Sequence, residues 1–544
     1  MRGQASFDLI EAPWIRALRH DGRPTEVSIL ELFGSAAELR SIVGEVPTQT
    51  FATVRLLLAI LHRAIDGPQT TEDWHELWRS GELPMEDITD YLDGFRDRFD
   101  LLHPRTPFYQ VADLHTSKNE FFGLERLIAD VPNGEPFFTS RVKDGLTRVS
   151  FAEAARWVVH CQAFDPSGIK SGAVGDPRVK GGRGYPIGTG WCGRLGGLFA
   201  EGRNVRETLL LNLSGGLSED DLPAWERPPS DAREADVAGR PDGQVDLYTW
   251  QSRRIRLFAD ADGVYGVLIA NGDKLDPHNL HGVEPLTAWR RSPAQEKARK
   301  EPLVYLPRTH DPDRSLWQGL GALLPSATGS RSSRDGATAV APAVLEWIAQ
   351  LEVEGLLAGD YVVRTRAIGM EYGSQAATTA EVFDDSLTLA AALLKEQDTE
   401  LGACAVGAVA DAERGVQALG NLASNLAQAA GDRQPGARGK AHELGYSMLD
   451  GPFRSWLAGL RTDTDILQAR REWQLAARRI LGDLGRQMVA DAGPTAWVGR
   501  EVDDTRPGKD TRHVSSPEAD LSFRRQIAKA FELAGKPDRD EVPA

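Results

Sequence analysis

Cysteine is scarce in this sequence of 544 residues, which contains only Cys161, Cys192 and Cys404. Their wide spacing matches neither a disulfide framework nor a zinc site, so we expect no bound metal and no cross-link. Apolar runs of the roughly 20 residues that a membrane helix needs are also missing. Asp8 and Glu11 interrupt the amino-terminal segment, which therefore lacks the apolar core of a signal peptide. We expect a cytoplasmic protein that does not associate with membranes.

Signatures of catalysis are missing as well. A phosphate-binding P-loop needs Gly, four residues and then Gly-Lys-Ser/Thr, whereas the sequence offers only GIKSG, and that follows a helical pattern. No G-x-G-x-x-G stands between a strand and a helix, and no G-x-S-x-G elbow occurs. The pair His278 and His281 in DPHNLHG falls in an expected loop. We therefore expect a binding protein without a cofactor rather than an enzyme.

A net positive charge is also missing: the sequence has 63 Lys and Arg against 79 Asp and Glu, a formal net charge of −16. Free-standing, non-specific nucleic-acid binders are normally basic, so this class is disfavoured. Residues 386–544 carry 21 Lys and Arg against 23 Asp and Glu, so most of the excess acid lies in residues 1–385. Within that acidic part, Ser167 to Arg194 holds five cations and one acid, Asp176. Binding depends on a local patch rather than on the total charge, so this segment is a candidate site.

Two regions differ in composition. Residues 1–385 mix strand and helix patterns, whereas residues 386–544 are rich in Ala, Leu, Gln and Arg and poor in strand formers. We predict an α+β protein, with a large mixed α/β N-terminal domain over 1–385 and a C-terminal four-helix bundle over 386–544. The expected helices of the bundle are 392–430, 437–461, 465–492 and 518–534. The third has a predicted apolar seam of Ile466, Trp473, Ala477, Ile480, Leu484 and Met488.

Three stretches of the first region have clear local patterns. TQTFATVRLLLAILHRAI predicts a buried helix with Thr48 as its N-cap. SFAEAARWVVHCQAF predicts a helix that begins at Ser150, with Glu153 in capping-box spacing. DLYTWQSRRIRLFADADGVYGVLIANG predicts two strands around a turn at DADG. Segments 216–244 and 325–338 are expected to be surface loops or disordered insertions.

The stretch SGIKSGAVGDPRVKGGRGYPIGTG, residues 167–190, holds eight glycines, four cations and one acid. Glycine lets backbone amides approach a ligand, and Lys170, Arg178, Lys180 and Arg183 are able to neutralise phosphates. This combination suits a nucleic-acid backbone or a nucleotide. It is equally typical of a flexible surface loop with scattered charges.

Separated motifs carry a resemblance to a known family. Six stretches occur in the order seen in the CasA family. They are FDLIEAPWI, EVSILELF, VPTQTFATVRLLLAILHRA, HPRTPFYQ, LYTWQSRRIRL and IGMEYGSQ. CasA is the large subunit of Cascade, the type I-E CRISPR surveillance complex. The resemblance implies a non-catalytic subunit that reads the protospacer-adjacent motif on duplex DNA, starts strand separation and docks the CRISPR helicase-nuclease. It implies the guide RNA and the other Cascade subunits, CasB, CasC, CasD and CasE, as further partners.

The resemblance also implies site residues. The glycine loop of the family resembles Gly181 and Gly182, flanked here by Lys180 and Arg183, and its lysine finger resembles Lys274 in NGDKLD. These elements approach the minor groove in the family. Because the minor groove presents a degenerate pattern, we expect tolerance of several motif sequences rather than recognition of one.

Two further residues follow from the same resemblance. Gln375 in GMEYGSQA resembles the wedge that separates the strands, and Phe138 in NGEPFFTSR resembles a contact to the guide RNA. Gln375 is alternatively a turn residue after Gly373, Lys274 an exposed turn lysine, and Phe138 a core residue. The alternative function is a stand-alone enzyme that holds a phosphorylated ligand at the glycine-rich segment through Lys170.

Overall fold

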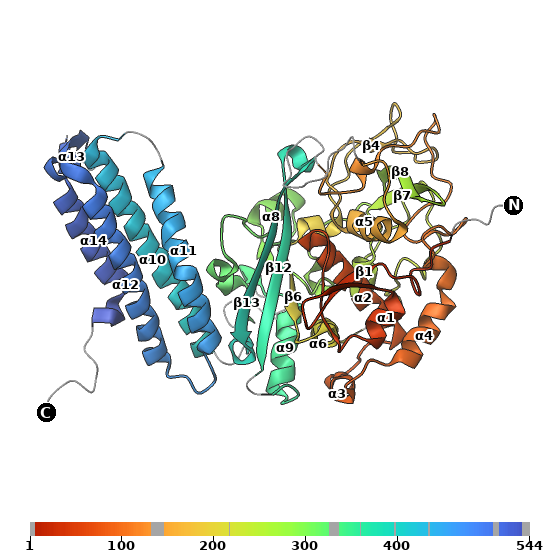
Figure 1. The fold of residues 1–544 in the computed structure, drawn as a ribbon, viewed down its shortest axis with the longest axis horizontal. Helices are drawn as coiled ribbons and strands as arrows, with labels where there is room; N and C mark the ends of the chain where they lie inside the picture. Colours follow the sequence, from red (N-terminus) through yellow and green to blue (C-terminus); the bar gives the residue numbers. More distant parts are fainter. Residues whose placement is uncertain are drawn as a thin grey trace. The chain divides into compact units, whose positions relative to one another are not determined.

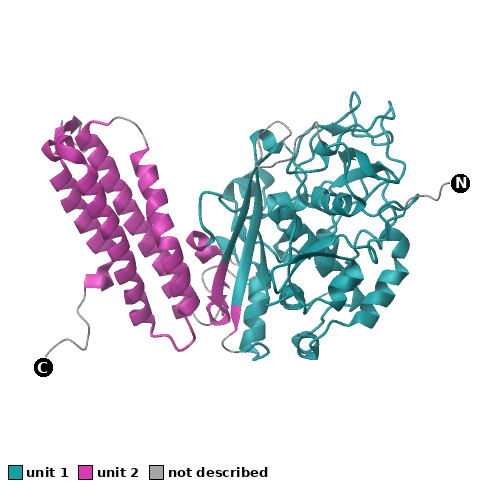
Figure 2. Ribbon diagram, viewed as in Figure 1, with its two compact units in different colours: residues 1–316, 328–358, 363–386 teal, residues 317–327, 359–362, 387–544 magenta. Residues whose placement is uncertain are grey.

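The fold was taken from a computed structural model that describes residues 6–131, 146–216, 218–325, 337–358, 361–395, 399–432, 436–503 and 511–535. The chain divides into two compact units (Figure 2): unit 1 comprises residues 1–316, 328–358 and 363–386, and unit 2 comprises 317–327, 359–362 and 387–544. Unit 1 mixes helices with small sheets, and unit 2 is mainly helical. The α+β class is confirmed, whereas domains that end and begin at 385 and 386 stay a prediction.

Unit 1 is built from short helices and strands (Figure 1). Its described α-helices are α1 Ile29–Gly34, α2 Pro47–Ala64, α3 Thr71–Ser80, α4 Met85–Gly94, α5 Phe151–Phe164, α6 Val205–Asn212, α7 Gln244–Tyr248, α8 Pro293–Arg299 and α9 Ala343–Val353. Its strands are β1 Ile15–Arg19, β2 Pro24–Val27, β3 Leu39–Ile42, β4 Lys170–Ser171, β5 Arg183–Gly184, β6 Gly197–Glu201, β7 Arg253–Asp260, β8 Gly263–Asn271, β9 Trp289–Arg291, β10 Tyr305–Pro307, β11 Ala339–Val340, β12 Val362–Tyr372 and β13 Thr379–Ala390. The three-stranded sheets have the orders β2-β1-β3, β10-β9-β11 and β13-β12-β6, and β4-β5 and β7-β8 form pairs.

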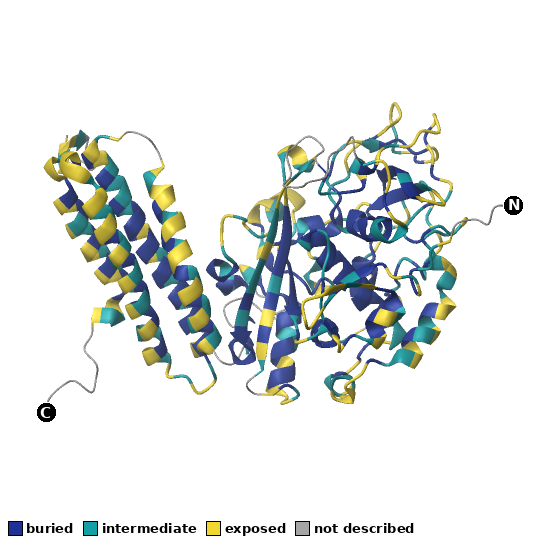
Figure 3. Cartoon of the chain, in the orientation of Figure 1, coloured by how far each residue is buried: buried dark blue, intermediate teal, exposed yellow. Residues whose placement is uncertain are grey.

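Helix α2 lies in the core of unit 1 and is buried on nearly every side (Figure 3). The helix begins at Pro47, which suits the first helical position because its missing N–H has no partner to lose there. Its cap is Val46, so the prediction of Thr48 as N-cap is wrong. The ring of Phe51 lies 6.4 Å from that of Phe164 in α5 and 6.1 Å from that of Phe199 in β6. These contacts hold α5 and β6 against α2.

Helix α5 and the β7–β8 hairpin have the predicted form. Ser150 Oγ accepts a hydrogen bond from the backbone N–H of Glu153, and the helix begins at the next residue. Strand β7 pairs antiparallel with β8 from Arg253, opposite Asn271, to Asp260, opposite Gly263. The hairpin therefore places Asn271, at the end of β8, beside Arg253, at the start of β7.

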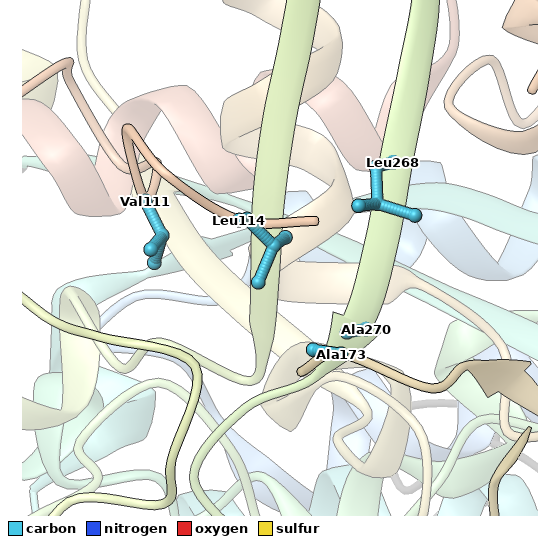
Figure 4. Packing of buried hydrophobic residues seen from close by; sticks show 5 residues of the cluster. All are labelled: Val111, Leu114, Ala173, Leu268 and Ala270. Carbon is cyan, nitrogen blue, oxygen red and sulfur yellow. The ribbon is translucent and has the colours of Figure 1, made fainter. Parts of the chain in front are cut away.

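A buried apolar cluster joins the glycine-rich segment to β8. Ala173 packs with Leu268 and Ala270 of β8 and with Val111 and Leu114 (Figure 4). The segment is thus anchored in the core close to its start, which argues against the alternative of a flexible surface loop for this part of it.

Unit 2 contains helices α10 Thr399–Ala430, α11 Ala437–Gly459, α12 Ile466–Asp491, α13 Gly493–Val498 and α14 Ser516–Ala530, and the strand pair β14 Arg500–Asp503 and β15 Thr511–Val514. The four long helices match the predicted ones. Helix α13 and the β14–β15 pair were not predicted from the sequence. The buried side of α12 contains Leu481 and Gly485, whereas Ile480 and Leu484 of the predicted seam are only half-buried.

Residues 218–243 run without a helix or strand, as the sequence predicts, and most of segment 325–338 lies outside the described residues. Among the described residues, no helix combines the length and the apolar character that crossing a bilayer requires.

Candidate functional site

The predicted glycine loop is a tight two-residue hairpin turn between Lys180 and Arg183, which ends the connection from β4 and leads directly into β5. The backbone N–H of Lys180 donates to the carbonyl of Arg183 at 3.0 Å, and the reverse bond measures 3.1 Å. Between them Gly181 and Gly182 have φ of +58° and +73°, the left-handed region that a two-residue hairpin turn of this kind requires at both positions. All four residues are exposed, and they are named the hairpin tip below.

The space around the hairpin tip is open. A Cβ atom added to Gly181 or Gly182 would meet no heavy atom within 4 Å. Within the described part of the chain, neither Lys180 nor Arg183 forms an ion pair. The tip therefore offers backbone amides and two cations to an approaching ligand.

Lys170 and Arg178, the other cations of the segment, are already committed to protein partners. Lys170 Nζ and Arg253 Nε both lie 2.5 Å from Asp165 Oδ2. Burial opposes ionisation of the Asp165 carboxyl, but the two cations outweigh it and hold its pKa below the usual value. Arg178 forms ion pairs with Asp176 at 3.0 Å and Glu234 at 3.1 Å. The expectation that Lys170 and Arg178 neutralise phosphates is therefore wrong.

Arg178 instead joins the glycine-rich segment to the end of β8. Its Nη1 donates to the carbonyl of Gly272 at 3.0 Å, and its Nη2 donates to the carbonyl of Asn271 at 3.3 Å. Asn271 Nδ2 in turn donates to the carbonyl of Tyr185 at 2.6 Å. The segment and the chain that leaves β8 are thus fixed to each other on both sides of the hairpin tip.

Lys274 lies just beyond this junction and is exposed. Its backbone N–H donates to Glu234 Oε1 at 2.9 Å, and Glu234 is the same carboxylate that pairs with Arg178. The preceding residue, Asp273, is buried, and its carbonyl accepts from Trp250 Nε1 at 3.0 Å. The structure therefore brings Lys274 and the glycine-rich segment together on one hydrogen-bonded support.

Gln375 lies in the turn that connects β12 with β13, and it is exposed. Gln375 and Ala376 have φ of +55° and +53°, a conformation that costs non-glycine residues roughly 1–2 kcal/mol each. The carbonyl of Thr378 accepts from the N–H of Gly373 at 2.9 Å and closes the turn. The surrounding strands thus hold the glutamine in a strained position.

A cavity of about 370 Å³ lies between the residues that follow this turn and the start of the glycine-rich segment. It is lined by Ala377, Thr378 and Thr379 after the turn and by residues 165–170 at the start of the segment. No hydrogen bond or ion pair joins Gln375 directly to Lys274 or to the hairpin tip within the described part of the chain. Gln375 therefore neighbours the beginning of the segment rather than its tip.

The cavity does not have the charge that a phosphorylated ligand needs. Its cationic lining residues, Arg126 and Lys170, are balanced by Glu125 and Asp165. Lys170 is bonded to Asp165, and burial lowers the pKa of its ammonium group. These observations disfavour the enzyme alternative, which needs Lys170 to contact a phosphate.

Phe138 and its motif fall in residues 132–145, which lie outside the described residues, so the guide-RNA contact stays a prediction. The three cysteines are buried and unpaired, and burial raises the pKa of each thiol, for Cys192 to about 12. Such thiols are poor nucleophiles. In the part of the chain that the structure describes, no group of three His, Cys, Asp or Glu side chains is arranged to hold a metal ion.

Glu234 was not singled out from the sequence. It belongs to the acidic run SEDDLPAWERPPSDAREAD, in which no local pattern separates one carboxylate from another. Its two partners, Arg178 and Lys274, lie 56 residues earlier and 40 residues later in the chain.

Comparison with known proteins finds relatives over nearly the whole chain. Residues 8–484 match the family model described as CRISPR-associated protein Cse1. The crystal structure of Cse1 from Thermobifida fusca is 52% identical and has a TM-score of 0.89, with coverage of 97% of this chain and 99% of that chain. A CasA/Cse1 protein of Thermus thermophilus is 36% identical over 337 residues, and the match spans 59% of this chain and 61% of that relative.

The fold also occurs within a larger assembly. A chain in the structure of a CRISPR RNA-guided surveillance complex has a TM-score of 0.68 at 18% identity, with coverage of 97% of this chain and 99% of that chain. At this level of identity the likeness shows a shared fold.

Proposed function

This chain belongs to the CRISPR-associated Cse1 family, and we propose that it is the non-catalytic large subunit of a type I-E CRISPR surveillance complex, Cascade. In this role it recognises the protospacer-adjacent motif of duplex DNA from the minor groove and starts strand separation for R-loop formation. Its proposed partners are target DNA, the guide RNA, CasB, CasC, CasD, CasE and the helicase-nuclease. The fold that it shares with a chain of an RNA-guided surveillance complex supports this assignment.

The observation that carries the proposal is the common support of Lys274 and the hairpin tip. Both are exposed, and Arg178 and Glu234 tie the backbone around Lys274 to the glycine-rich segment. A duplex that lies against this support is able to contact an amine and two glycine amides together. Phosphate contacts by Gly181, Gly182, Lys180 and Arg183 position the duplex, and contacts to base edges specify it.

The chemistry of Lys274 suits the minor groove. There, A·T pairs present only acceptors, whereas the exocyclic amine of guanine repels an ammonium donor. A single lysine distinguishes few DNA sequences from one another, so the proposed recognition tolerates several motifs. The guide RNA then supplies sequence specificity by base pairing.

Gln375 is the proposed wedge. Its carboxamide carries donors and acceptors that are able to bond bases whose partners have been removed. Unstacking one step costs a few kcal/mol, and an exposed side chain on a strained but fixed turn is suited to offset part of that cost. Lys274 and the hairpin tip hold the motif while Gln375 contacts the first base pair beyond it.

Contact of Phe138 with the guide RNA and recruitment of the helicase-nuclease complete the proposal. Replacing Phe138 with alanine is expected to reduce the guide RNA that co-purifies with the tagged chain. Equal recovery of RNA with Phe138→Ala and the wild type would reject that contact.

The proposal is tested with the complex assembled from the full chain, its partner subunits and a guide RNA. Lys274→Ala is expected to weaken binding of a motif-bearing duplex about tenfold, the scale of one lost base contact, and to leave binding of a motif-free duplex nearly unchanged. The matched control is Arg79→Ala, which removes an exposed cation from α3, far from β4 and β8 in Figure 1. Equal affinities for Lys274→Ala and the wild type would reject the lysine assignment.

A further inference from the structure

The acidic segment 218–243 contributes to the support of Lys274 through a buried arginine. Arg254 Nε donates to the carbonyl of Asp231 at 2.9 Å, and its Nη2 donates to the carbonyl of Arg233, also at 2.9 Å. The same Nη2 lies 2.6 Å from Asp273 Oδ1. The side chain of Arg254 is 1% exposed, so these bonds are shielded from water. The backbone of residues 231–233 is therefore fixed against the end of β8.

Two carboxylates at this junction each accept a hydrogen bond from a backbone N–H of the other chain segment. Glu234 accepts from the backbone N–H of Lys274 at 2.9 Å, and Asp273 accepts from the backbone N–H of Ala235 at 2.8 Å. Each chain segment thus supplies an acceptor to an amide of the other. The main chain of Lys274 is held in place while its side chain remains exposed.

The second oxygen of Glu234 contacts the glycine-rich segment. Glu234 Oε2 lies 3.1 Å from Arg178 Nη1, and Arg178 is also paired with Asp176. One carboxylate therefore bonds both the chain that presents Lys274 and the segment that forms the hairpin tip.

The charge of Glu234 opposes the binding of DNA in general. Its side chain is 32% exposed, and a carboxylate near a phosphate backbone raises the energy of the complex. A favourable effect of Glu234 on DNA binding would therefore have to come from geometry rather than from attraction. A fixed distance between Lys274 and the hairpin tip favours only those duplexes that satisfy both contacts at once.

We propose that Glu234 is a positioning residue that fixes Lys274 relative to the hairpin tip and thereby sets the discrimination between motif-bearing and motif-free DNA, an inference that rests on the proposed function. The quantity to measure is the ratio of the Kd of the complex for a motif-free duplex to its Kd for a motif-bearing duplex. Glu234→Ala removes both bonds, and we expect the ratio to fall about tenfold. Glu234→Gln keeps an acceptor for the Lys274 amide, and we expect it to restore part of the ratio.

Asp236→Asn is the matched control, because Asp236 belongs to the same segment and its carboxylate accepts only a local bond, from the N–H of Ala238, among the described residues. Its charge loss equals that of Glu234→Gln, so a purely electrostatic effect would tighten both duplexes equally in both variants. Arg178→Gln is expected to lower the ratio as well, and its effect should not add to that of Glu234→Gln. Thermal unfolding of each variant monitors folding.

Two outcomes separate this inference from the proposed function. A wild-type ratio for Glu234→Ala together with a lowered ratio for Lys274→Ala would overturn the positioning role alone. A wild-type ratio for both variants would overturn the lysine assignment and the positioning role together. Equal loss of the ratio in Asp236→Asn and Glu234→Gln would also reject the role, because Asp236 makes neither of the two bonds on which the role depends.

Discussion

The guanidinium of Arg178 donates to the backbone carbonyl of Gly272 at 3.0 Å. Together with the contacts of Asn271 and Glu234, this bond connects the segment that contains the turn at residues 181–182 to the chain that presents Lys274. We therefore expect the two elements to act together in the proposed recognition of DNA.

Replacing Gly181 or Gly182 with alanine is expected to weaken binding of motif-bearing DNA. Both glycines have positive φ, which costs an alanine roughly 1–2 kcal/mol, although each site has open space. The turn therefore opens and the amides lose their orientation. Duplex affinity of the assembled complex checks this expectation. Gly439→Ala in α11 is the control, because that glycine has equal space without a left-handed φ; a matching loss of affinity there would contradict the explanation.

Gln375→Gly is expected to separate the strain of the turn from the function of the amide. Glycine accepts positive φ freely, so the variant should unfold at a slightly higher temperature than the wild type. It should nevertheless fail to open the first base pair, which 2-aminopurine fluorescence at that position reports. Ala376→Gly relieves the same kind of strain and keeps the glutamine, so it should open the duplex normally. Normal opening by Gln375→Gly would rule out the wedge.

His62 gives the stability of unit 1 a predictable dependence on pH. Burial lowers its pKa to about 3, against about 6.5 in an unfolded chain. Between these values only the unfolded state binds the proton, so the free energy of unfolding falls by about 1.4 kcal/mol for each pH unit below 6.5. The loss ends near the folded-state pKa.

His62→Leu should reduce this dependence. Neither ring nitrogen of His62 has a hydrogen-bond partner among the described residues, so leucine removes a titrating group without breaking a side-chain bond. Chemical denaturation at pH 7.5, 6.0 and 5.0 measures the difference. An unchanged slope between pH 6.0 and 5.0 would contradict the explanation.

Asp411 is expected to be the most sensitive carboxylate of unit 2. It is buried, and its Oδ2 lies 2.5 Å from Arg470 Nε and 2.8 Å from Gln474 Nε2, which joins α10 to α12. Asp411→Ala leaves Arg470 without this partner and should destabilise unit 2 by about 3–5 kcal/mol. Thermal unfolding measures the loss. The exposed pair of Asp483 and Arg486 serves as the comparison, since Asp483→Ala should change stability by about 1 kcal/mol or less.

Local patterns in the sequence predicted much of the fold. The strands β7 and β8, rich in β-branched and aromatic residues around the DADG turn, and the cap at Ser150 depend on neighbouring residues, and both predictions are confirmed. The start of α2 was misplaced because Pro47 fixes the first helical position and removes the need for a side-chain cap at Thr48. Local chemistry alone decided each of these cases.

Long-range packing explains the errors in the predicted seam of α12 and in the predicted phosphate contacts of Lys170 and Arg178. Gly485 occupies the core side of α12 because a Cβ there would lie 2.1 Å from the Phe523 ring of α14, a constraint that apolar spacing does not contain. In the candidate site, Lys170 and Arg178 looked equivalent to Lys180 and Arg183. Only the fold brings Asp165 and Glu234 to the first two and leaves the others exposed.

The most direct test of the account is a structure of the assembled complex bound to a motif-bearing duplex. The account predicts the amine of Lys274 against base edges in the minor groove, the amides of Gly181 and Gly182 at the phosphates, and Gln375 at the first opened base pair. A duplex that contacts another face of the subunit, with Lys274 and the hairpin tip in solvent, would contradict it.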